Sequence, residues 1–219
     1  MRRSRQPSKD GIKDPIMEEV EEAVARQMSG TIASEKGEYM DWEFRLLDWI
    51  QELHTPFGDA LMPFLSRLGD FGLIWIILAA VLLFVPKYRR LGFVVAAALI
   101  ADLILCNIII KPLVARTRPY DVNTLIELIV AKPFDYSFPS GHTAAAFAAV
   151  SAMFFVKNRL WIPAGVLAVL IAFSRMYLYV HYPTDILGGI IVGIVCGAVG
   201  AAVVCEVEKR KRKKSPAEP

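Results

Sequence analysis

Two uninterrupted apolar stretches constrain this chain more than any other feature of its sequence. Ile186 to Cys205 contains no charged residue, and Leu91 to Ile110 contains only Asp102. Stretches of about 20 apolar residues match the ~30 Å hydrocarbon core that a membrane-spanning helix must cross. Hydrophobic residues make up 55% of the chain, which exceeds their share in an ordinary soluble domain. The sequence therefore predicts a multi-spanning membrane protein and argues against a soluble monomer, a disordered chain and a disulfide scaffold.

The remaining pattern predicts an all-α, polytopic membrane helical bundle. Residues 42–54 mix Trp, Phe, Leu and Ile with charges at helical spacing, which favours a helix in the membrane interface. A second short helix is expected over Phe57 to Leu68. Five spans with short connections are then expected near residues 70–86, 91–115, 141–156, 160–177 and 184–205. If residues 42–68 cross the membrane instead, the bundle has six transmembrane helices.

Basic residues predict the orientation of these spans. Lys209 to Lys214 form an unbroken basic run directly after the last span. By the positive-inside bias, such a run is typical of a cytoplasmic flank rather than of a nuclear signal or a nucleic-acid patch. If the five spans alternate, the basic turns at residues 86–90 and 157–159 share this cytoplasmic side. The loop over residues 116–139 and the segment over residues 175–185 then lie outside.

Three regions follow from this topology. We expect a polar N-terminal tail over residues 1–41, a membrane-embedded domain over residues 42–205 and a basic cytoplasmic tail over residues 206–219. Five spans place the N-terminal tail outside, whereas six return it to the cytoplasm. The sequence leaves this choice open, together with the oligomeric state.

Small residues in the last span predict close helix packing. Gly189, Gly193 and Gly197 recur at four-residue intervals, and Gly200 follows. This spacing lets two helices approach closely in lipid. We favour packing within one chain over a dimer interface.

Polar groups beside a membrane cost free energy and are therefore candidates for function. The first such group runs from Lys111 to Pro119 and includes Arg118. Lys111 and Arg118 are seven residues apart, close to two helical turns, so we expect them on one helix face, with Pro119 breaking the helix. Since the charge bias places this end outside, these basic residues favour an anionic ligand over an ordinary basic helix end.

The second group is Phe138-Pro139-Ser140-Gly141-His142-Thr143, directly before an apolar helix. Ser140 is the expected N-cap, and Gly141 lets the backbone come close to a ligand. The N–H groups of that first turn would form an anion site strengthened by the helix dipole, with His142 beside it. The alternative is a helix cap with a surface histidine.

The third group is Ser174-Arg175, followed by His181 and Asp185. A carboxylate within reach of one imidazole nitrogen fixes the tautomer and leaves the other nitrogen free to act as a nucleophile. The alternative is a capping aspartate and a satisfied interfacial histidine.

Together, the patterns Lys-x6-Arg-Pro, Pro-Ser-Gly-His and Ser-Arg-x5-His-x3-Asp resemble the three-part signature of the type 2 phosphatidic acid phosphatase superfamily. The resemblance covers roughly residues 57–205, fills every signature position and is greatest to compact bacterial members such as the undecaprenyl-diphosphate phosphatases. It implies that His181 attacks phosphorus and becomes a phosphohistidine, with Asp185 orienting it. His142 would protonate the leaving oxygen and then activate water. The phosphoryl oxygens would be held by Lys111, Arg118, Ser140, Gly141 and Arg175.

This resemblance implies a membrane lipid phosphatase that acts on a phosphate monoester or diphosphate. Undecaprenyl diphosphate is the expected substrate, and phosphatidylglycerophosphate and phosphatidic acid are the alternatives. The expected spans argue against the soluble haloperoxidases that share this phosphate pocket. A non-catalytic lipid transporter is the alternative from another class.

Three fixed cations and a helix N-terminus can stabilise a transferring phosphoryl group without a metal. The outer side offers no paired acidic cluster for a divalent ion, so we expect metal-independent hydrolysis and no cofactor. Asn107 shares the predicted face of Lys111 and is a candidate for a supporting role. Arg116 is a candidate contact to a second phosphate.

Overall fold

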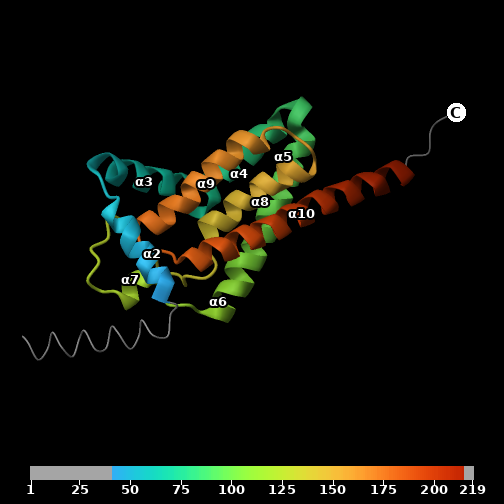
Figure 1. Cartoon of the computed structure of the whole chain (residues 1–219). Coiled ribbons are helices and arrows are strands. Elements are labelled where there is room, and N and C mark those ends of the chain that lie inside the picture. Colours follow the sequence, from blue (N-terminus) through green and yellow to red (C-terminus); the bar gives the residue numbers. More distant parts are fainter. Residues whose placement is uncertain (1–40, 215–219) are drawn as a thin grey trace, which may run out of the picture. The chain divides into compact units, whose positions relative to one another are not determined.

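The protein folds as a bundle of helices (Figure 1). The structure, a computed structural model, describes residues 41–214, so the predicted N-terminal tail before Asp41 and the last five residues lie outside the described part. All regular elements of residues 41–214 are helical, which confirms the predicted all-α class. The main helices are α2 (Asp41–Glu52), α3 (Pro56–Leu68), α4 (Leu73–Phe84), α5 (Arg89–Asp102), α8 (Gly141–Phe155), α9 (Trp161–Tyr177) and α10 (Pro183–Lys214).

Each predicted span has a helix, but the helices differ in length. Pro86–Val122 and Pro183–Lys213 are long and apolar enough to cross a membrane. The pair α3 and α4, bent by 45° at the short 3-10 helix η1 (Asp70–Gly72), passes the same test as one broken span. α8 and α9 are apolar but have 15 and 17 residues, fewer than the ~20 that a full crossing needs. Among the described residues, two helices are thus long and apolar enough to cross a membrane, or three if the bent pair counts as one span.

The second predicted span is not a regular α-helix. α5 continues into a π-helix, η3 (Leu103–Ile110), and then into the short helix α6 (Lys111–Val114). Ala115 has a left-handed backbone (φ 48°) that ends α6, and Pro119 begins the next short helix, α7 (Pro119–Val122). The prediction that Pro119 breaks the helix is therefore wrong, since the break comes four residues earlier. π-helical segments occur often at functional sites.

The glycines of α10 allow it to contact the backbones of α8 and α5. A Cβ atom at Gly193 would lie 2.6 Å from the carbonyl oxygen of Ala144, and one at Gly200 would lie 2.6 Å from the backbone nitrogen of Ala98. Side-chain carbons do not approach backbone atoms this closely, so a larger residue would force the helices apart. The structure thus confirms that this glycine pattern serves packing within one chain.

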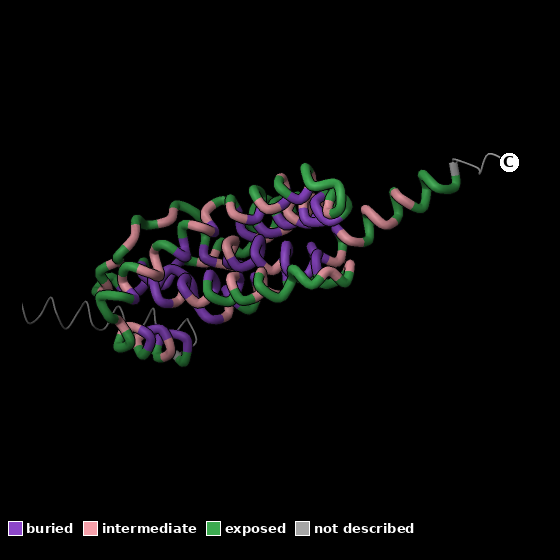
Figure 2. Tube along the Cα trace, turned by 90° about the horizontal axis from the view of Figure 1, so that it is seen from above, coloured by how far each residue is buried: buried purple, intermediate pink, exposed green. Residues whose placement is uncertain are grey.

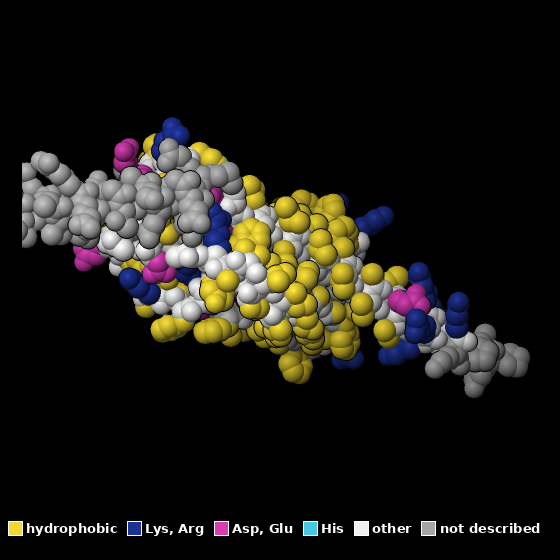
Figure 3. Space-filling view, turned by 90° about the horizontal axis from the view of Figure 1, so that it is seen from below, with side chains coloured by type: hydrophobic (Ala, Val, Ile, Leu, Met, Phe, Trp, Pro, Cys, Tyr) yellow, Lys and Arg dark blue, Asp and Glu magenta, His cyan; other side chains and the backbone are white. Residues whose placement is uncertain are grey.

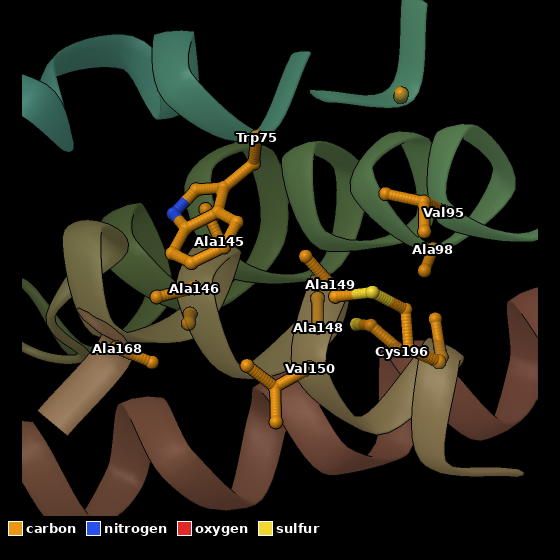
Figure 4. Close-up of a cluster of buried hydrophobic side chains, with 14 of the residues drawn as sticks. Trp75, Val95, Ala98, Ala145, Ala146, Ala148, Ala149, Val150, Ala168 and Cys196 are labelled. Carbon is orange, nitrogen blue, oxygen red and sulfur yellow. The ribbon is translucent and has the colours of Figure 1, made fainter. Parts of the chain in front are cut away.

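α8 lies at the centre of the bundle and contacts α5, α9 and α10. Its small side chains, such as Ala146 and Ala149, are fully buried and pack beside Trp75 of α4 (Figure 4). Figure 2 shows the buried residues on the inner faces of the helices and the exposed residues outside. Small residues let apolar helices pack closely where lipid provides no hydrophobic driving force between them.

Apolar side chains also cover the outside of the bundle. Figure 3 shows a broad hydrophobic belt, with Lys and Arg gathered beyond it on the far part of α10. Exposed members of this surface include Ile76 of α4, Phe93 of α5, Val166 of α9 and Ile191 of α10. An exposed apolar surface of this extent is typical of contact with lipid.

The basic segments gather at one end of the bundle. Arg90 Nε lies 3.0 Å from Glu208 Oε1, which joins the first turn of α5 to the far part of α10. α8 ends and α9 begins beside Lys157. The expected basic tail after residue 205 is not a separate segment, because α10 runs on through it to Lys214 (Figure 1).

Candidate active site

The three sequence motifs meet at the opposite end of the bundle, where α8 begins, α9 ends and α10 begins. Arg118 Nη1, from the first motif, lies 3.3 Å from Nε2 of His181, from the third. The backbone N–H of Ser140, from the second motif, donates to the carbonyl oxygen of Asp185 at 3.0 Å. Residues far apart in the chain thus form one cluster.

His181 lies at the centre of this cluster and is 1% exposed. Its Nδ1 lies 3.4 Å from Asp185 Oδ2, and its Nε2 faces Arg118. Because a guanidinium can only donate, Nε2 is the accepting nitrogen and the ring proton sits on Nδ1. Burial lowers the pKa of His181 well below 6.5, and the charges of Arg118, Arg175 and Lys111 lower this pKa further. His181 is therefore a neutral imidazole with a lone pair on Nε2.

Asp185 is held by several donors besides His181 and is itself fully buried. Its Oδ2 accepts from the backbone N–H of Tyr182 at 2.9 Å and from the hydroxyl of Ser137 at 2.5 Å. Its Oδ1 accepts from Arg116 Nη1 at 2.6 Å. The bond from Tyr182, three residues earlier and just before α10, forms half of a capping box, so Asp185 caps α10, while its role in orienting His181 stays a prediction.

Lys111 and Arg118 converge on one carboxylate. Lys111 Nζ donates to Asp135 Oδ2, and Arg118 Nη2 donates to Asp135 Oδ1 at 2.5 Å. The prediction that these two cations share a helix face is wrong, because α6 ends at Val114 and Arg118 has an extended backbone. Their side chains nevertheless meet, since the loop after α6 turns back toward the site.

Arg175 supplies a third buried cation. It lies in the last turn of α9, is 4% exposed and donates from Nη1 to the hydroxyl of Ser66 on α3. Within the described residues, its Nε–H has no hydrogen-bond partner. A buried donor without a partner costs free energy, so this N–H is available to an anion.

Ser140 occupies the predicted N-cap position of α8, but its side chain does not cap the helix. Its hydroxyl instead accepts a hydrogen bond from Thr143 Oγ1 at 3.0 Å. A Cβ atom at Gly141 would lie 3.2 Å from Asn107 Oδ1 and 3.6 Å from Lys111 Nζ. The helix N-terminus, which carries a partial positive charge, therefore lies directly against Lys111, and Asn107 lies in the same cluster.

His142 has a partner that the sequence does not indicate. Its Nε2 lies 2.8 Å from Oδ1 of Asp70, in the short helix between α3 and α4. The side chain of His142 is 20% exposed and that of Asp70 is 48% exposed. His142 is thus held by a carboxylate at the edge of the cluster, where solvent reaches it.

Several polar residues of this cluster are missed by motif reasoning. They belong to none of the three patterns and approach the site through helix packing and loop folding: Glu43, Ser66, Asp70, Asp135 and Ser137. The structure places Arg116 against Asp185 and Glu43, rather than leaving it as an isolated contact for a second phosphate. Glycines flanking Asp70 between two apolar helices are the one local signal that could have marked it.

The acidic and histidine side chains are spread among these cations. In the described part of the chain, no three His, Cys, Asp or Glu side chains are grouped so that they could hold a metal ion. Metal-independent chemistry stays a prediction. What the arrangement can do is bind an anion between three cations and a helix N-terminus, with a neutral imidazole beside it.

Known proteins are similar to this chain in sequence. The chain is 32% identical over 136 residues to an undecaprenyl-diphosphatase of the archaeon Sulfolobus acidocaldarius, a match that covers 62% of this chain and 65% of the relative. It is 30% identical over 144 residues to the undecaprenyl-diphosphatase BcrC of Bacillus subtilis, covering 66% of this chain and 74% of the relative. This chain thus spans just under two thirds of the archaeal relative.

A solved structure and a family profile agree with these relatives. A transmembrane PAP2-type phosphatidylglycerolphosphate phosphatase of Bacillus subtilis superposes with a TM-score of 0.58 at 25% identity, covering 86% of this chain and 95% of that one. The profile of the PAP2 superfamily matches residues 88–208, which include all three motifs. The chain belongs to the PAP2 superfamily.

Proposed function

We propose that this protein is an integral-membrane lipid phosphatase that hydrolyses undecaprenyl diphosphate through a phosphohistidine on His181. The observation that carries the proposal is the convergence of three buried cations on a neutral, carboxylate-held histidine. A non-catalytic lipid transporter needs no such imidazole. The family of the chain and the names of its relatives point to the same chemistry.

The terminal phosphoryl group would bind where the three cations and the start of α8 meet. Lys111 and Arg118 already hold a carboxylate, which resembles a phosphoryl group in charge and oxygen geometry. Arg175 offers its Nε–H, and the Ser140 hydroxyl and the Gly141 amide lie at the helix N-terminus. Fixed cations suit phosphoryl transfer, because catalysis of this reaction is mostly positioning and charge stabilisation.

In the first chemical step, the Nε2 lone pair of His181 attacks phosphorus and a P–N bond forms as the bond to the leaving oxygen breaks. The imidazolium that results keeps its Nδ1 proton directed at Asp185, whose negative charge stabilises it. His142 donates a proton to the leaving oxygen.

In the second step, the now neutral His142 accepts a proton from a water molecule, which attacks phosphorus and breaks the P–N bond. Orthophosphate leaves and His181 regains its neutral form. Asp70 holds the ring of His142 through both proton transfers.

Relatives favour undecaprenyl diphosphate as the substrate, since both sequence relatives described above are named for it. Phosphatidylglycerophosphate is the second candidate, because the superposed solved structure is a phosphatidylglycerolphosphate phosphatase. Both lipids present a terminal phosphate group to the same cations. The difference between them lies in the leaving group, a lipid phosphate in one case and an alcohol in the other.

The site would face the outside of the cell membrane. The basic turns and the far part of α10 lie at the end of the bundle opposite the site, and a basic end is typical of the cytoplasmic side.

The test is phosphate release by the detergent-purified protein in excess EDTA, with His181→Ala alongside. Undecaprenyl diphosphate, phosphatidylglycerophosphate and phosphatidic acid are compared by kcat/KM under one set of conditions. We expect the highest value for undecaprenyl diphosphate and no turnover by His181→Ala. Activity that disappears in EDTA and returns with Mg²⁺ would contradict the metal-free mechanism, and a higher kcat/KM for phosphatidylglycerophosphate would reassign the substrate.

A further inference from the structure

Glu43 is a buried carboxylate on α2, the helix that the sequence assigns to the membrane interface. Its side chain is fully buried, although its neighbour Trp42 is 42% exposed. Glutamate is almost never fully buried unless it is paired. Glu43 Oε2 accepts from Arg116 Nη2 at 2.6 Å, and its Oε1 accepts from the backbone N–H of Thr184 at 3.2 Å and from the Thr184 hydroxyl at 2.5 Å. These contacts attach α2 to the start of α10.

Arg116 uses its two terminal nitrogens for two different carboxylates. Nη2 donates to Glu43, and Nη1 donates to Asp185 Oδ1 at 2.6 Å and to the Thr184 hydroxyl at 2.7 Å. The guanidinium carbon also lies 3.9 Å from the centre of the Tyr182 ring. A planar guanidinium held on two edges and one face has a defined position.

These contacts form a continuous chain from α2 to the imidazole: Glu43, Arg116, Asp185 and His181. We propose that Glu43 and Arg116 are positioning residues of the phosphatase reaction, which set the orientation and the effective charge of Asp185. The inference rests on the proposed role of His181 as the nucleophile. α2 is then part of the catalytic apparatus and not simply a membrane contact.

The charges explain why both Glu43 and Arg116 are needed. Arg116 alone would neutralise Asp185 and leave it a weak partner for the imidazolium that forms in the reaction. Glu43 restores one negative charge to the group, so that the two carboxylates and one guanidinium balance one imidazolium. In a buried environment such a balance matters more than it does in water.

The negative charge of this group opposes the effect of other groups that face His181. Arg118 and Lys111 approach from the segment after the π-helix, Arg175 from α9 and His142 from α8. All four disfavour the imidazolium, whereas Asp185 lies on α10 beside Nδ1. Loss of the Glu43 charge should therefore make His181 harder to protonate and should weaken the stabilisation of the phosphoenzyme transition state.

α2 offers a matched control for the alternative that this helix is only an anchor. Asp48 Oδ1 accepts from the hydroxyl of Tyr179 at 2.7 Å, so a second carboxylate of the same helix contacts the connection just before α10. Its contact does not lead to Asp185. If α2 acts as an anchor alone, Glu43→Gln and Asp48→Asn should have similar effects.

The experiment compares the purified full chain with Glu43→Gln, Glu43→Asp, Asp48→Asn, Arg116→Lys, Asp185→Asn and the double variant Glu43→Gln/Asp185→Asn. The readouts are kcat and KM for undecaprenyl diphosphate and the pH dependence of kcat/KM. We expect Glu43→Gln to lower kcat by roughly 10- to 100-fold, the usual range for partners that orient a site residue, with KM little changed. Its acidic limb should move to lower pH, and Glu43→Asp should recover part of the activity.

In the Asp185→Asn background, Glu43→Gln should have little further effect, because residues that act as a unit are not additive. Arg116→Lys keeps the charge but cannot bridge two carboxylates, so it should lower kcat as Glu43→Gln does. It takes the place of Glu43→Gln as the test if that variant fails to fold. Equal losses in Glu43→Gln and Asp48→Asn, or an undiminished effect of Glu43→Gln beside Asp185→Asn, would overturn the inference. A wild-type protein that releases no phosphate would instead overturn the proposed function, and the inference with it.

Discussion

Asp70 Oδ1 lies 2.8 Å from Nε2 of His142, although the two residues are 72 positions apart in the chain. The contact joins the bend between α3 and α4 to the first turn of α8. The arrangement at His142 thus parallels the one at His181, where Asp185 faces one ring nitrogen. Two histidines with separate carboxylates suit two separate roles in one reaction.

Asp70→Asn should lower kcat by about 10- to 100-fold, because His142 loses the carboxylate that orients its ring and stabilises its protonated form. Since Asp70 does not touch the three cations, KM should change little. The measurement is steady-state hydrolysis of undecaprenyl diphosphate, with Asp59→Asn as the control, an aspartate of α3 that faces Tyr177. A change confined to KM would show that Asp70 acts on substrate binding.

The two histidines can be separated by the leaving group. His181→Ala should abolish turnover of every substrate, because no covalent step remains. His142→Ala should retain more activity on p-nitrophenyl phosphate than on a lipid phosphate monoester, since p-nitrophenolate leaves with little protonation. General acid assistance is typically worth about 10²–10⁴-fold, so the contrast is measurable.

Because dephosphorylation also uses His142, this contrast must be read from the burst of p-nitrophenol in rapid-quench experiments. A burst that survives in His181→Ala would assign the nucleophile elsewhere. Equal losses on both substrates in His142→Ala would remove its role as general acid.

His181 should stay neutral at acidic pH. Burial and neighbouring cations lower its pKa well below 6.5, so the neutral nucleophilic form should persist as the pH falls through 6.5. The chain has three histidines, so their ring signals can be followed by ¹⁵N NMR in detergent micelles and assigned with His181→Gln and His142→Gln. A His181 ring that titrates near 6.5 would contradict the buried, cation-lined geometry.

Asp135→Asn should tighten the binding of phosphate groups. Asp135 is half-exposed and occupies Lys111 and Arg118, so a substrate phosphate must displace it. Removing its charge should lower the inhibition constant of orthophosphate by roughly three- to tenfold, equivalent to about 1 kcal/mol. Glu127→Gln, an exposed residue of the same loop, is the control. Weaker phosphate inhibition in Asp135→Asn would show that this carboxylate supports the site and does not compete for it.

Cysteine labelling should reveal the sidedness of the site. Once Cys205 is replaced by Ser, the two remaining native cysteines, Cys106 and Cys196, are buried, so labelling reports the accessibility of an added cysteine. Glu127→Cys, in the loop beside the site, should react with an impermeant reagent on intact cells, because the basic end of the bundle is expected inside. Arg159→Cys, at the basic end, should react with the same reagent only after the cells are lysed. The reverse pattern would place the site in the cytoplasm.

Much of this protein follows from local properties of its sequence. The length of the charge-free stretch at Ile186–Cys205 dictates a long apolar helix, and Pro183 marks its start, because both depend on neighbouring residues alone. Gly193 and Gly200 likewise indicate close packing, since small side chains allow it wherever the partner lies. The three motifs identify the chemistry through residue type and spacing.

Tertiary structure alone decided how that chemistry is assembled. The π-helix at Leu103–Ile110 and the left-handed Ala115 change the direction of Lys111 and Arg118, and 3.6-residue periodicity cannot anticipate such a change. Glu43 and Asp70 are ordinary charged residues in the sequence. Their partners lie more than 70 positions away, so their roles depend on how α2 and the bend before α4 pack against α8 and α10. Contacts of this range depend on the packing of whole helices, which no short stretch of sequence specifies.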